Sequence, residues 1–243
     1  MRRFVPLLLA VIACACLSFQ HGAENAGVQT IYVIGDGVRA YTVANLEKMP
    51  MKELKIPDFA LGRSVGWKGV PLGELGSGRV VNVINRDGEI VSIPGNASAV
   101  LALYRDGEPF NGSPRLVMPL NYGCKCHWLP NVTVLEFVKG ASLHIYGDVE
   151  NELWLTGRTL GLYHSPEAVA NGNISSVPLS WAIRLANPWP EAKKAYLVFE
   201  NETAEYSLDK LLSGSFTLRF NGTAFEIPEL GIDGLVEIRV GGD

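Results

Sequence analysis

The sequence predicts a predominantly β protein of the α+β class, built as two related β-rich units. Three observations support this fold class. Several short runs are rich in β-branched residues and alternate apolar with polar positions, which is typical of strands. Gly, Asp, Asn and Pro clusters separate these runs, as turns do. The order of segments in the first half recurs in the second half, which indicates an internal repeat.

Length and composition narrow the classes of protein. A chain of 243 residues, 47% hydrophobic and 19% charged, has enough apolar material for one large domain or two small ones. Its formal net charge of -4 gives no basic surplus. Nucleic acid is therefore excluded as an expected partner, because nucleic-acid binding requires a concentrated positive charge.

The N-terminus, residues 1–20, predicts a signal peptide. Arg2 and Arg3 precede an apolar run over residues 4–17 that is short for a membrane span. The letters V-I-A-C, ending at Cys14, also fit a lipobox, in which this Cys becomes the lipidated first residue of the mature chain. The alternative is an ordinary signal peptide whose removal discards Cys14. Either way we expect an exported protein at the cell surface or outside the cell, with a membrane anchor through lipid if Cys14 is modified.

Sequons support export. The Asn-x-Ser/Thr motif is the acceptor for N-glycosylation, and this chain is enriched in it. The expected glycosylation sites are Asn96, Asn131, Asn173, Asn201 and Asn221. Asn111 also begins a sequon, but Pro114 follows that sequon directly. The enrichment indicates a cell-surface glycoprotein of an archaeon or a eukaryote.

The chain after the signal begins with a strand. Residues 29–35 combine β-branched and aromatic residues and end at Gly-Asp-Gly, which predicts a strand and a turn. Residues 41–46 predict a short strand that passes into a helix. Either Thr42 or Asn45 can serve as the N-cap, because both side chains accept hydrogen bonds from the backbone of a first helical turn.

The middle of the first unit alternates turns with strands. Residues 67–75 predict a turn followed by a short helix. A hairpin is expected over residues 79–93, with Arg-Asp-Gly-Glu at 86–89 as its turn. Periodicity does not separate helix from strand over residues 97–103. Residues 131–138, N-V-T-V-L-E-F-V, predict a strand.

A second unit, residues 141–243, repeats the order of the first unit, residues 29–139. The segments that correspond are residues 31–36 and 143–148, 70–75 and 177–183, 80–93 and 195–208, 101–108 and 216–223, and 131–137 and 234–240. The register between them is loose but the order is kept throughout. We interpret the chain as two copies of one unit with a boundary near Gly140; the alternative is a single domain with repeated hairpins.

Most of the chemistry of the first unit lies in residues 106–128. Its prolines and glycines predict ordered loop with a short strand at 115–118, which carries a fixed positive charge. A turn at 121–123 follows, and two cations together with turn N–H groups suit an anion or phosphate. The residues expected to bind such a ligand are Arg115, Tyr122, Gly123, Lys125 and His127. The alternative is a Pro-rich connection whose Arg and Lys are solvated.

The second unit lacks this stretch. Between Phe225 and Gly231 it has only E-I-P-E-L, so that Glu226 and Glu229 stand where the first unit has cations. These carboxylates would repel an anion. We therefore expect one anion site per chain, in the first unit.

Two thiols, Cys124 and Cys126, follow the turn. The sequence C-K-C-H is one residue short of a covalent haem motif. A disulfide between the two thiols is possible in an exported protein although it would be strained, and a metal bound with His127, His144 or His164 is the second alternative. Unpaired thiols are the third. If the signal peptide is removed, these are the remaining cysteines, so no disulfide framework stabilises the fold.

Residues 29–137 resemble the molybdopterin-binding domain of sulfite-oxidase-type oxidoreductases. The family shows W-x-G-V-x-L, a segment ending in N-G-E-P-L, then G-x-P-x-R-L-x-x-P, then G-x-K-x-x-K-W. The corresponding pieces here, in the same order, are Y-T-V-A-N-L-E-K-M-P at 41–50, G-W-K-G-V-P-L-G-E-L at 66–75, L-A-L-Y-R-D-G-E-P at 101–109 with S-P-R-L-V-M-P at 113–119, and Y-G-C-K-C-H-W-L-P-N-V at 122–132.

This resemblance implies a sulfite-oxidase-type fold in which Arg115, Gly123 and Lys125 face a pterin phosphate. His127 falls near the family's second Lys. One departure is large, because the family's molybdenum is held by a cysteine upstream of the W-x-G-V motif. Residues 56–66 contain no Cys, and Ser64 or Asp58 cannot replace a thiolate without a change of metal chemistry.

Three functions follow as hypotheses. The first is an exported binding or accessory protein on this scaffold, which takes an anion or pterin-type ligand and lacks standard molybdenum catalysis. The second is an active molybdopterin-dependent oxidoreductase with an atypical metal ligand such as Cys124 or Cys126. The third is a structural cell-surface module that binds no small ligand.

Overall fold

The computed structural model of the chain describes residues 29–58, 60–109, 113–122, 128–172, 174–200 and 202–242. The predicted sites outside these residues are the signal peptide with Cys14, the residues Gly123, Cys124, Lys125, Cys126 and His127, and the acceptors Asn111, Asn173 and Asn201. The fold is predominantly β, as predicted. Within the described ranges, no helix has the length and apolar character needed to cross a membrane.

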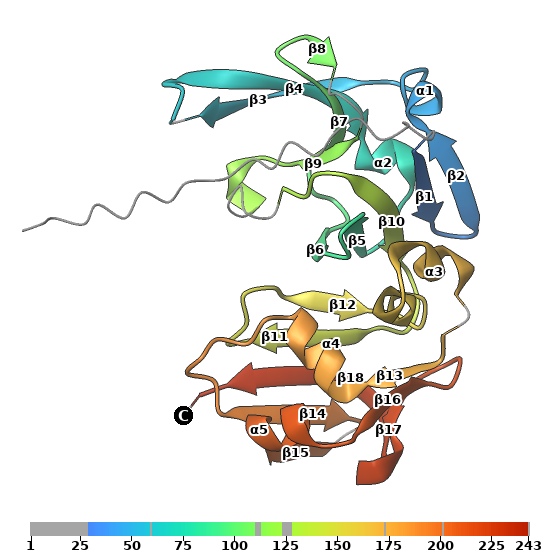
Figure 1. The fold of residues 1–243 in the computed structure, drawn as a ribbon, viewed down its shortest axis with the longest axis vertical. Helices are drawn as coiled ribbons and strands as arrows, with labels where there is room; N and C mark the ends of the chain where they lie inside the picture. Colours follow the sequence, from blue (N-terminus) through green and yellow to red (C-terminus); the bar gives the residue numbers. More distant parts are fainter. Residues whose placement is uncertain are drawn as a thin grey trace, which may run out of the picture.

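The first sheet forms the middle of the molecule (Figure 1). Its strands, in the order β2-β1-β10-β5-β6, are β2 (Val38–Thr42), β1 (Thr30–Ile34), β10 (Val132–Val138), β5 (Val80–Asn85) and β6 (Ile90–Pro94). β1 and β10 pair in parallel, and the other neighbours are antiparallel. Every residue of β5 and β10 is buried, because the sheet is covered on both faces. The predicted hairpin at 79–93 and the strand at 131–138 are both present.

A second sheet covers one face of the first. It contains β3 (Lys52–Asp58), β4 (Arg63–Pro71), β7 (Val100–Arg105), β8 (Glu108–Pro109) and β9 (Arg115–Val117). The short helices α1 (Val43–Leu46) and α2 (Leu72–Leu75) and the 3-10 turn η1 (Leu120–Tyr122) complete this half. Thr42 caps α1 by accepting a hydrogen bond from the Asn45 N–H, as one of the two predicted caps.

One expectation needs correction here, and one open alternative is decided. The turn predicted at the start of residues 67–75 is part of strand β4, and only Leu72–Leu75 is helical. The ambiguous segment 97–103 forms strand β7 from Val100 onwards. Both outcomes have one physical cause: residues 67–71 of β4 pair with residues 100–105 of β7 at a close approach, where a Cβ on Gly69 would lie 2.1 Å from the Leu101 carbonyl oxygen. The glycine that suggested a turn instead permits strand contact.

The second half of the chain forms one larger sheet with helices beside it. Its strands are β11 (Leu143–Gly147), β12 (Leu153–Leu155), β13 (Ser176–Pro178), β14 (Lys194–Phe199), β15 (Glu202–Ser207), β16 (Thr217–Phe220), β17 (Phe225–Ile227) and β18 (Ile232–Gly241). Its helices are η3 (Thr159–Tyr163), α3 (Pro166–Asn171), α4 (Leu179–Leu185), α5 (Leu208–Ser213) and η4 (Pro228–Leu230). Ser165 caps α3 at its start, and Gly172 ends it in a left-handed conformation.

The two halves share an order of strand pairings. β11 and β18 pair in parallel, as β1 and β10 do. β12 pairs with β11 as β2 pairs with β1, and β14 lies antiparallel beside β18 as β5 lies beside β10. β15 then follows β14, in the place that β6 holds next to β5. The parallel pair in each half joins its first strand to its last.

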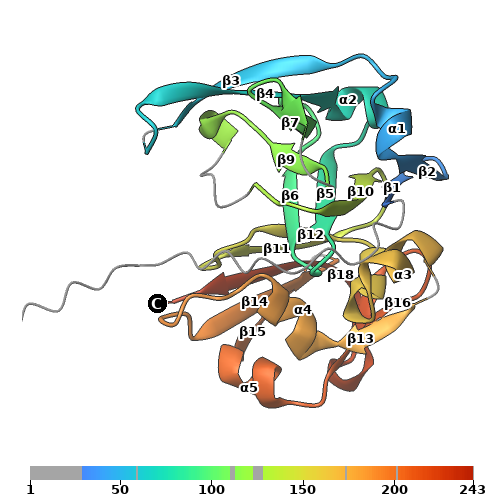
Figure 2. The same cartoon turned by 45° about the horizontal axis from the view of Figure 1, so that its top comes forward.

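A common apolar core joins the halves. Ile34, Ile84, Ile90 and Val134 of the first sheet belong to the same buried cluster as the core of the second half. Figure 2 shows β11 and β12 beneath β5 and β6. One face of the first sheet packs against the sheet of β3, β4 and β7. Its other face is therefore buried by the second half of the chain. Such burial stabilises the arrangement by roughly 25 cal/mol for each Å² of apolar surface removed from water.

Candidate anion-binding site

Arg115 is the first residue of strand β9, which is bonded to β7 on one side and to Leu129 on the other. β9 runs antiparallel to β7, with Arg115 opposite Ala102. Leu116 and Val117, the next residues, are fully buried, while the Arg115 side chain is half-buried. The Leu116 N–H donates to the Leu129 carbonyl over 2.9 Å, which ties β9 to the chain beyond the loop. The burial of its neighbours thus fixes the position from which the guanidinium extends.

A second guanidinium lies near Arg115. Arg105 stands at the end of β7, opposite Trp67 of β4, and its Cζ is 5.3 Å from the centroid of the Trp67 ring. Trp67 in turn meets Trp128 edge to face, with centroids 5.4 Å apart. Both tryptophans are buried and belong to the core of the first half. A guanidinium over an aromatic face is a stabilising contact.

The electrostatic environment of Arg115 is unfavourable for its own charge. Burial lowers the pKa of Arg115 from its ordinary value, and the positive charge of Arg105 lowers that pKa further. No described carboxylate forms an ion pair with Arg115. An anion between these two guanidinium groups would offset both the desolvation and the repulsion.

Asp106, the acid that directly follows Arg105 in the sequence, is already engaged. Its Oδ2 lies 2.8 Å from the Arg63 guanidinium, and its Oδ1 accepts the Gly66 N–H over 2.9 Å. The Arg63 bond, followed by the Gly66 N–H, lowers the pKa of Asp106. Asp106 thus ties the turn between β7 and β8 to strand β4.

The structure places only part of the predicted site. Arg115 lies on β9 and Tyr122 ends η1 by its backbone, whereas the Gly123–His127 segment with Lys125 is outside the described residues. The convergence of Arg115 and Lys125 therefore stays a prediction. Sequence reasoning missed Arg105. Its position at the end of a strand, directly before an Asp-Gly turn, was the available signal.

The described residues do not fit a molybdenum centre of the resembled kind. The stretch that would supply the thiolate, residues 56–66, includes the end of β3 and the start of β4, and its sequence has no Cys. Among the described residues, no three His, Cys, Asp or Glu side chains gather to hold a metal. His144 stacks on Trp154 at 3.8 Å between centroids, and its Nε2 lies 2.7 Å from Glu152.

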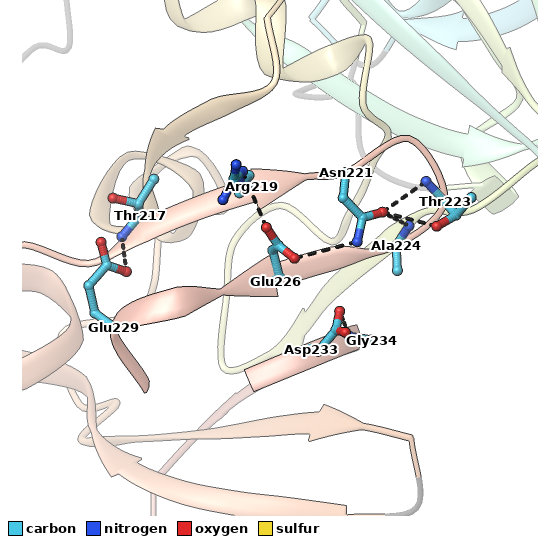
Figure 3. A network of polar contacts seen from close by, with 9 residues as sticks. All are labelled: Thr217, Arg219, Asn221, Thr223, Ala224, Glu226, Glu229, Asp233 and Gly234. Atoms are coloured by element: carbon cyan, nitrogen blue, oxygen red, sulfur yellow. Dashed lines mark hydrogen bonds and ion pairs between the residues drawn. The ribbon is translucent and has the colours of Figure 1, made fainter. Parts of the chain in front are cut away.

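In the second half, the two carboxylates that the sequence comparison sets against the cations of the first unit belong to a network of polar contacts (Figure 3). Glu226 Oε1 lies 3.2 Å from Arg219 Nε, and Glu229 Oε2 accepts the Thr217 N–H over 3.0 Å. Hydrogen bonds from Thr217 lower the pKa of Glu229. These carboxylates stabilise β16 and β17 and add negative charge.

The predicted glycosylation sites among the described residues differ in accessibility. Asn96 and Asn221 are exposed, whereas Asn131 is half-buried and has a left-handed backbone with φ +55°. In Figure 3 the Asn221 Oδ1 accepts hydrogen bonds from the backbone N–H groups of Thr223 and Ala224 and from the Thr223 hydroxyl, all at 3.0 Å. Among the described residues, the Asn221 Nδ2, to which a glycan would attach, makes only a long 3.4 Å contact with Glu226.

Comparison with known proteins gives distant likenesses to solved structures. No model of a protein family matches the chain, and no curated protein matches it. Among solved structures, the chain is similar to the sulfane dehydrogenase SoxCD from Paracoccus pantotrophus, with a TM-score of 0.36 and 13% sequence identity. The alignment covers 81% of this chain and 60% of that chain. A likeness at this level carries no argument about activity.

Proposed function

We propose that this chain is an exported binding or accessory protein that holds one small anion, such as a phosphate or a pterin phosphate, in its first half. One observation carries the proposal: the half-buried Arg115 lies near the guanidinium of Arg105, without an ion-pairing carboxylate among the described residues. Buried or half-buried charges are otherwise paired, so a missing counter-charge favours a ligand that supplies it. Lys125 and His127 would add to this site.

The restriction to one site per chain rests on the internal repeat. The shared order of pairings, β2-β1-β10-β5-β6 and β12-β11-β18-β14-β15, supports a duplication of one unit. Only the first copy has a half-buried arginine at the relevant segment. The second copy has Glu226 and Glu229 there, which would repel the same ligand.

Location at the cell surface is part of the proposal. The N-terminal apolar segment and the sequons are its support. Lipid on Cys14 would anchor the protein to a membrane, and glycans would cover its exposed loops. We assign no redox chemistry, because the described residues do not fit the metal centre of the resembled family.

Titration calorimetry on the mature, full chain tests the proposal. Inorganic phosphate, sulfate and a pterin monophosphate serve as probes. Arg115→Gln removes the charge and should weaken the bound anion about tenfold or more, since a charge-assisted hydrogen bond contributes about 1.5–3 kcal/mol. The matched control is Arg86→Gln, in the exposed turn between β5 and β6. It should leave the affinity unchanged.

Two outcomes would contradict the proposal. If no probe binds the wild-type chain, or if Arg115→Gln binds as tightly as the wild type, the chain is better described as a structural surface module. Metal analysis of protein from a cofactor-competent host adds a second test. Stoichiometric molybdenum would instead support an oxidoreductase with an atypical ligand such as Cys124 or Cys126.

A further inference from the structure

A cavity of about 610 Å³ opens where the two halves of the chain meet, away from Arg115. It lies on the side where α3 packs near β1 and β10 (Figure 1). Segments from both halves line it, and the residues that matter here are Gly35, Glu136, Lys139, Arg158, Ile174 and Phe220. Its volume lies in the range of about 300–1,000 Å³ that is usual for small-molecule sites, and junctions between folded units are a common place for them.

Glu136 on β10 contributes a buried carboxyl group to this cavity. It is 4% exposed, and both oxygens accept hydrogen bonds. The Asn82 Nδ2 donates to Oε2 over 3.0 Å. The Thr156 hydroxyl donates to Oε1 over 2.5 Å, because its own oxygen already accepts the backbone N–H groups of Arg158 and Thr159. These two hydrogen bonds favour the carboxylate form of Glu136, whereas its burial favours the neutral form.

Arg158 supplies a positive charge on the same wall. One of its terminal nitrogens donates to the Ala170 carbonyl over 2.9 Å, which caps the end of α3. Burial raises the pKa of Glu136 and the positive charge of Arg158 acts against that shift, so the two groups interact, yet the described contacts include no ion pair between them. Lys139, also on the wall, is neutralised by Asp36 at 2.7 Å. The cavity therefore presents one negative and one positive charge that do not neutralise each other directly.

The remaining wall is apolar. Ile34, Ile174 and Phe220 line the cavity and pack with the core that joins the halves. The Phe220 ring fits against Gly157, where an added Cβ would lie 2.2 Å from the ring. An apolar group of a ligand can be covered here while its polar end meets the charged residues.

We propose that this cavity binds a small zwitterion of the apolar α-amino acid class. Its ammonium group would bind the Glu136 carboxylate, its carboxylate would bind Arg158, and its side chain would lie against Ile174 and Phe220. A zwitterion matches the paired opposite charges of the wall, whereas a simple anion or cation would leave one of them without a partner.

Burial raises the pKa of Glu136, while Thr156, Asn82 and Arg158 act against that shift. A ligand ammonium would lower this pKa again, because it stabilises the charged form. Arg158 is the charged group of the second half that acts on Glu136. The other charged pair near this wall is Lys139, which directly follows β10, with Asp36. Affinity should therefore increase as pH rises through the pKa of Glu136 in the free protein.

The test uses the mature chain and three probes in calorimetry: L-phenylalanine, 3-phenylpropanoate, which lacks the ammonium, and phenethylamine, which lacks the carboxylate. L-phenylalanine should bind at least tenfold more tightly than either analogue. Gly35→Leu should reduce its affinity at least tenfold, because a side chain at Gly35 extends into open space beside the cavity. Gly37→Leu is the matched control, since it too meets no neighbouring atom but lies outside the cavity lining.

Glu136→Gln keeps the shape of the side chain and should abolish the pH dependence of binding. The proposal is overturned if apolar amino acids do not bind, if the three probes bind equally, or if Gly35→Leu binds as the wild type does. Phosphate binding at Arg115 is measured on the same variants. Because Gly35→Leu should leave phosphate binding unchanged, failure of one proposal is distinguished from failure of the other.

Discussion

The Thr156 hydroxyl donates a hydrogen bond to Glu136 Oε1 over 2.5 Å and so joins the second half of the chain to a buried acid of the first. Asn82 completes the link, because its Nδ2 donates both to Glu136 and to the Trp154 carbonyl, the latter over 2.7 Å. Ser92 donates to Asn82 Oδ1 and accepts the Trp154 N–H. A polar network in which each member is satisfied can fix the register of two packed sheets.

Loss of the Thr156 hydroxyl should destabilise the junction. Thr156→Val leaves Glu136 Oε1 buried without its donor, which costs about 1–3 kcal/mol of the free energy of unfolding. Urea denaturation followed by tryptophan fluorescence measures this cost. Thr203→Val on the exposed strand β15 is the control and should change stability by less than about 0.5 kcal/mol. Both variants are measured in unglycosylated protein, because Thr203 belongs to the Asn201 sequon. Equal effects of the two variants would contradict a special role for Thr156.

Glu136 should also make stability depend on pH. Its pKa in the folded chain is raised by burial above the ordinary value of 4.5. A raised folded-state pKa means that the folded state holds its proton more tightly than the unfolded state. The stabilising contribution is thus fully present below about pH 4.5 and is lost as pH rises through the folded pKa. The free energy of unfolding is measured at several pH values in this window for the wild type and for Glu136→Gln. Its dependence on pH should differ between the two proteins, and an equal dependence would argue against the assignment.

Gly69 should be intolerant of any side chain. An added Cβ would lie 2.1 Å from the Leu101 carbonyl oxygen, so Gly69→Ala must push β4 away from β7. We expect a loss of about 1–3 kcal/mol or more, as in overpacked cores. Gly73→Ala in α2 meets no atom within 4 Å and should be neutral or stabilising by up to about 1 kcal/mol. Thermal unfolding of both variants tests this prediction. Similar melting temperatures for Gly69→Ala and Gly73→Ala would contradict the close approach of β4 and β7.

Glycan occupancy should follow exposure. We expect Asn96 and Asn221 to carry glycan more fully than Asn131, which is half-buried with a left-handed backbone. Peptide mapping of protein from its native source, with and without glycosidase, measures occupancy at each position. Thr223→Ala should remove the glycan at Asn221, because it destroys that sequon. A glycan at Asn131 with none at Asn221 would contradict this order.

Local patterns determined much of the fold. The alternating segments at 79–93 and 131–138 predicted their strands, since the pleat places successive side chains on opposite faces and this period is visible in sequence. Thr42 as a helix cap was equally local. Strands β3 and β4 were missed because their signals, Pro57 and Gly69, normally indicate breaks, and only pairing with neighbours made them strands.

The residues of the candidate sites could be identified from local sequence, but their contacts with distant residues could not. The sequence alone identified Arg115 as a cation beside a turn and placed an acid within the strand at 131–138. The nearness of Arg105 to Arg115, and the contacts of Glu136 with Asn82, 54 positions away, and with Thr156, 20 positions away, were decided by the packing of sheets. Sequence sets which face of a strand is apolar. Which residues of another sheet meet that face depends on long-range pairing, whose free energy is shared over the whole core.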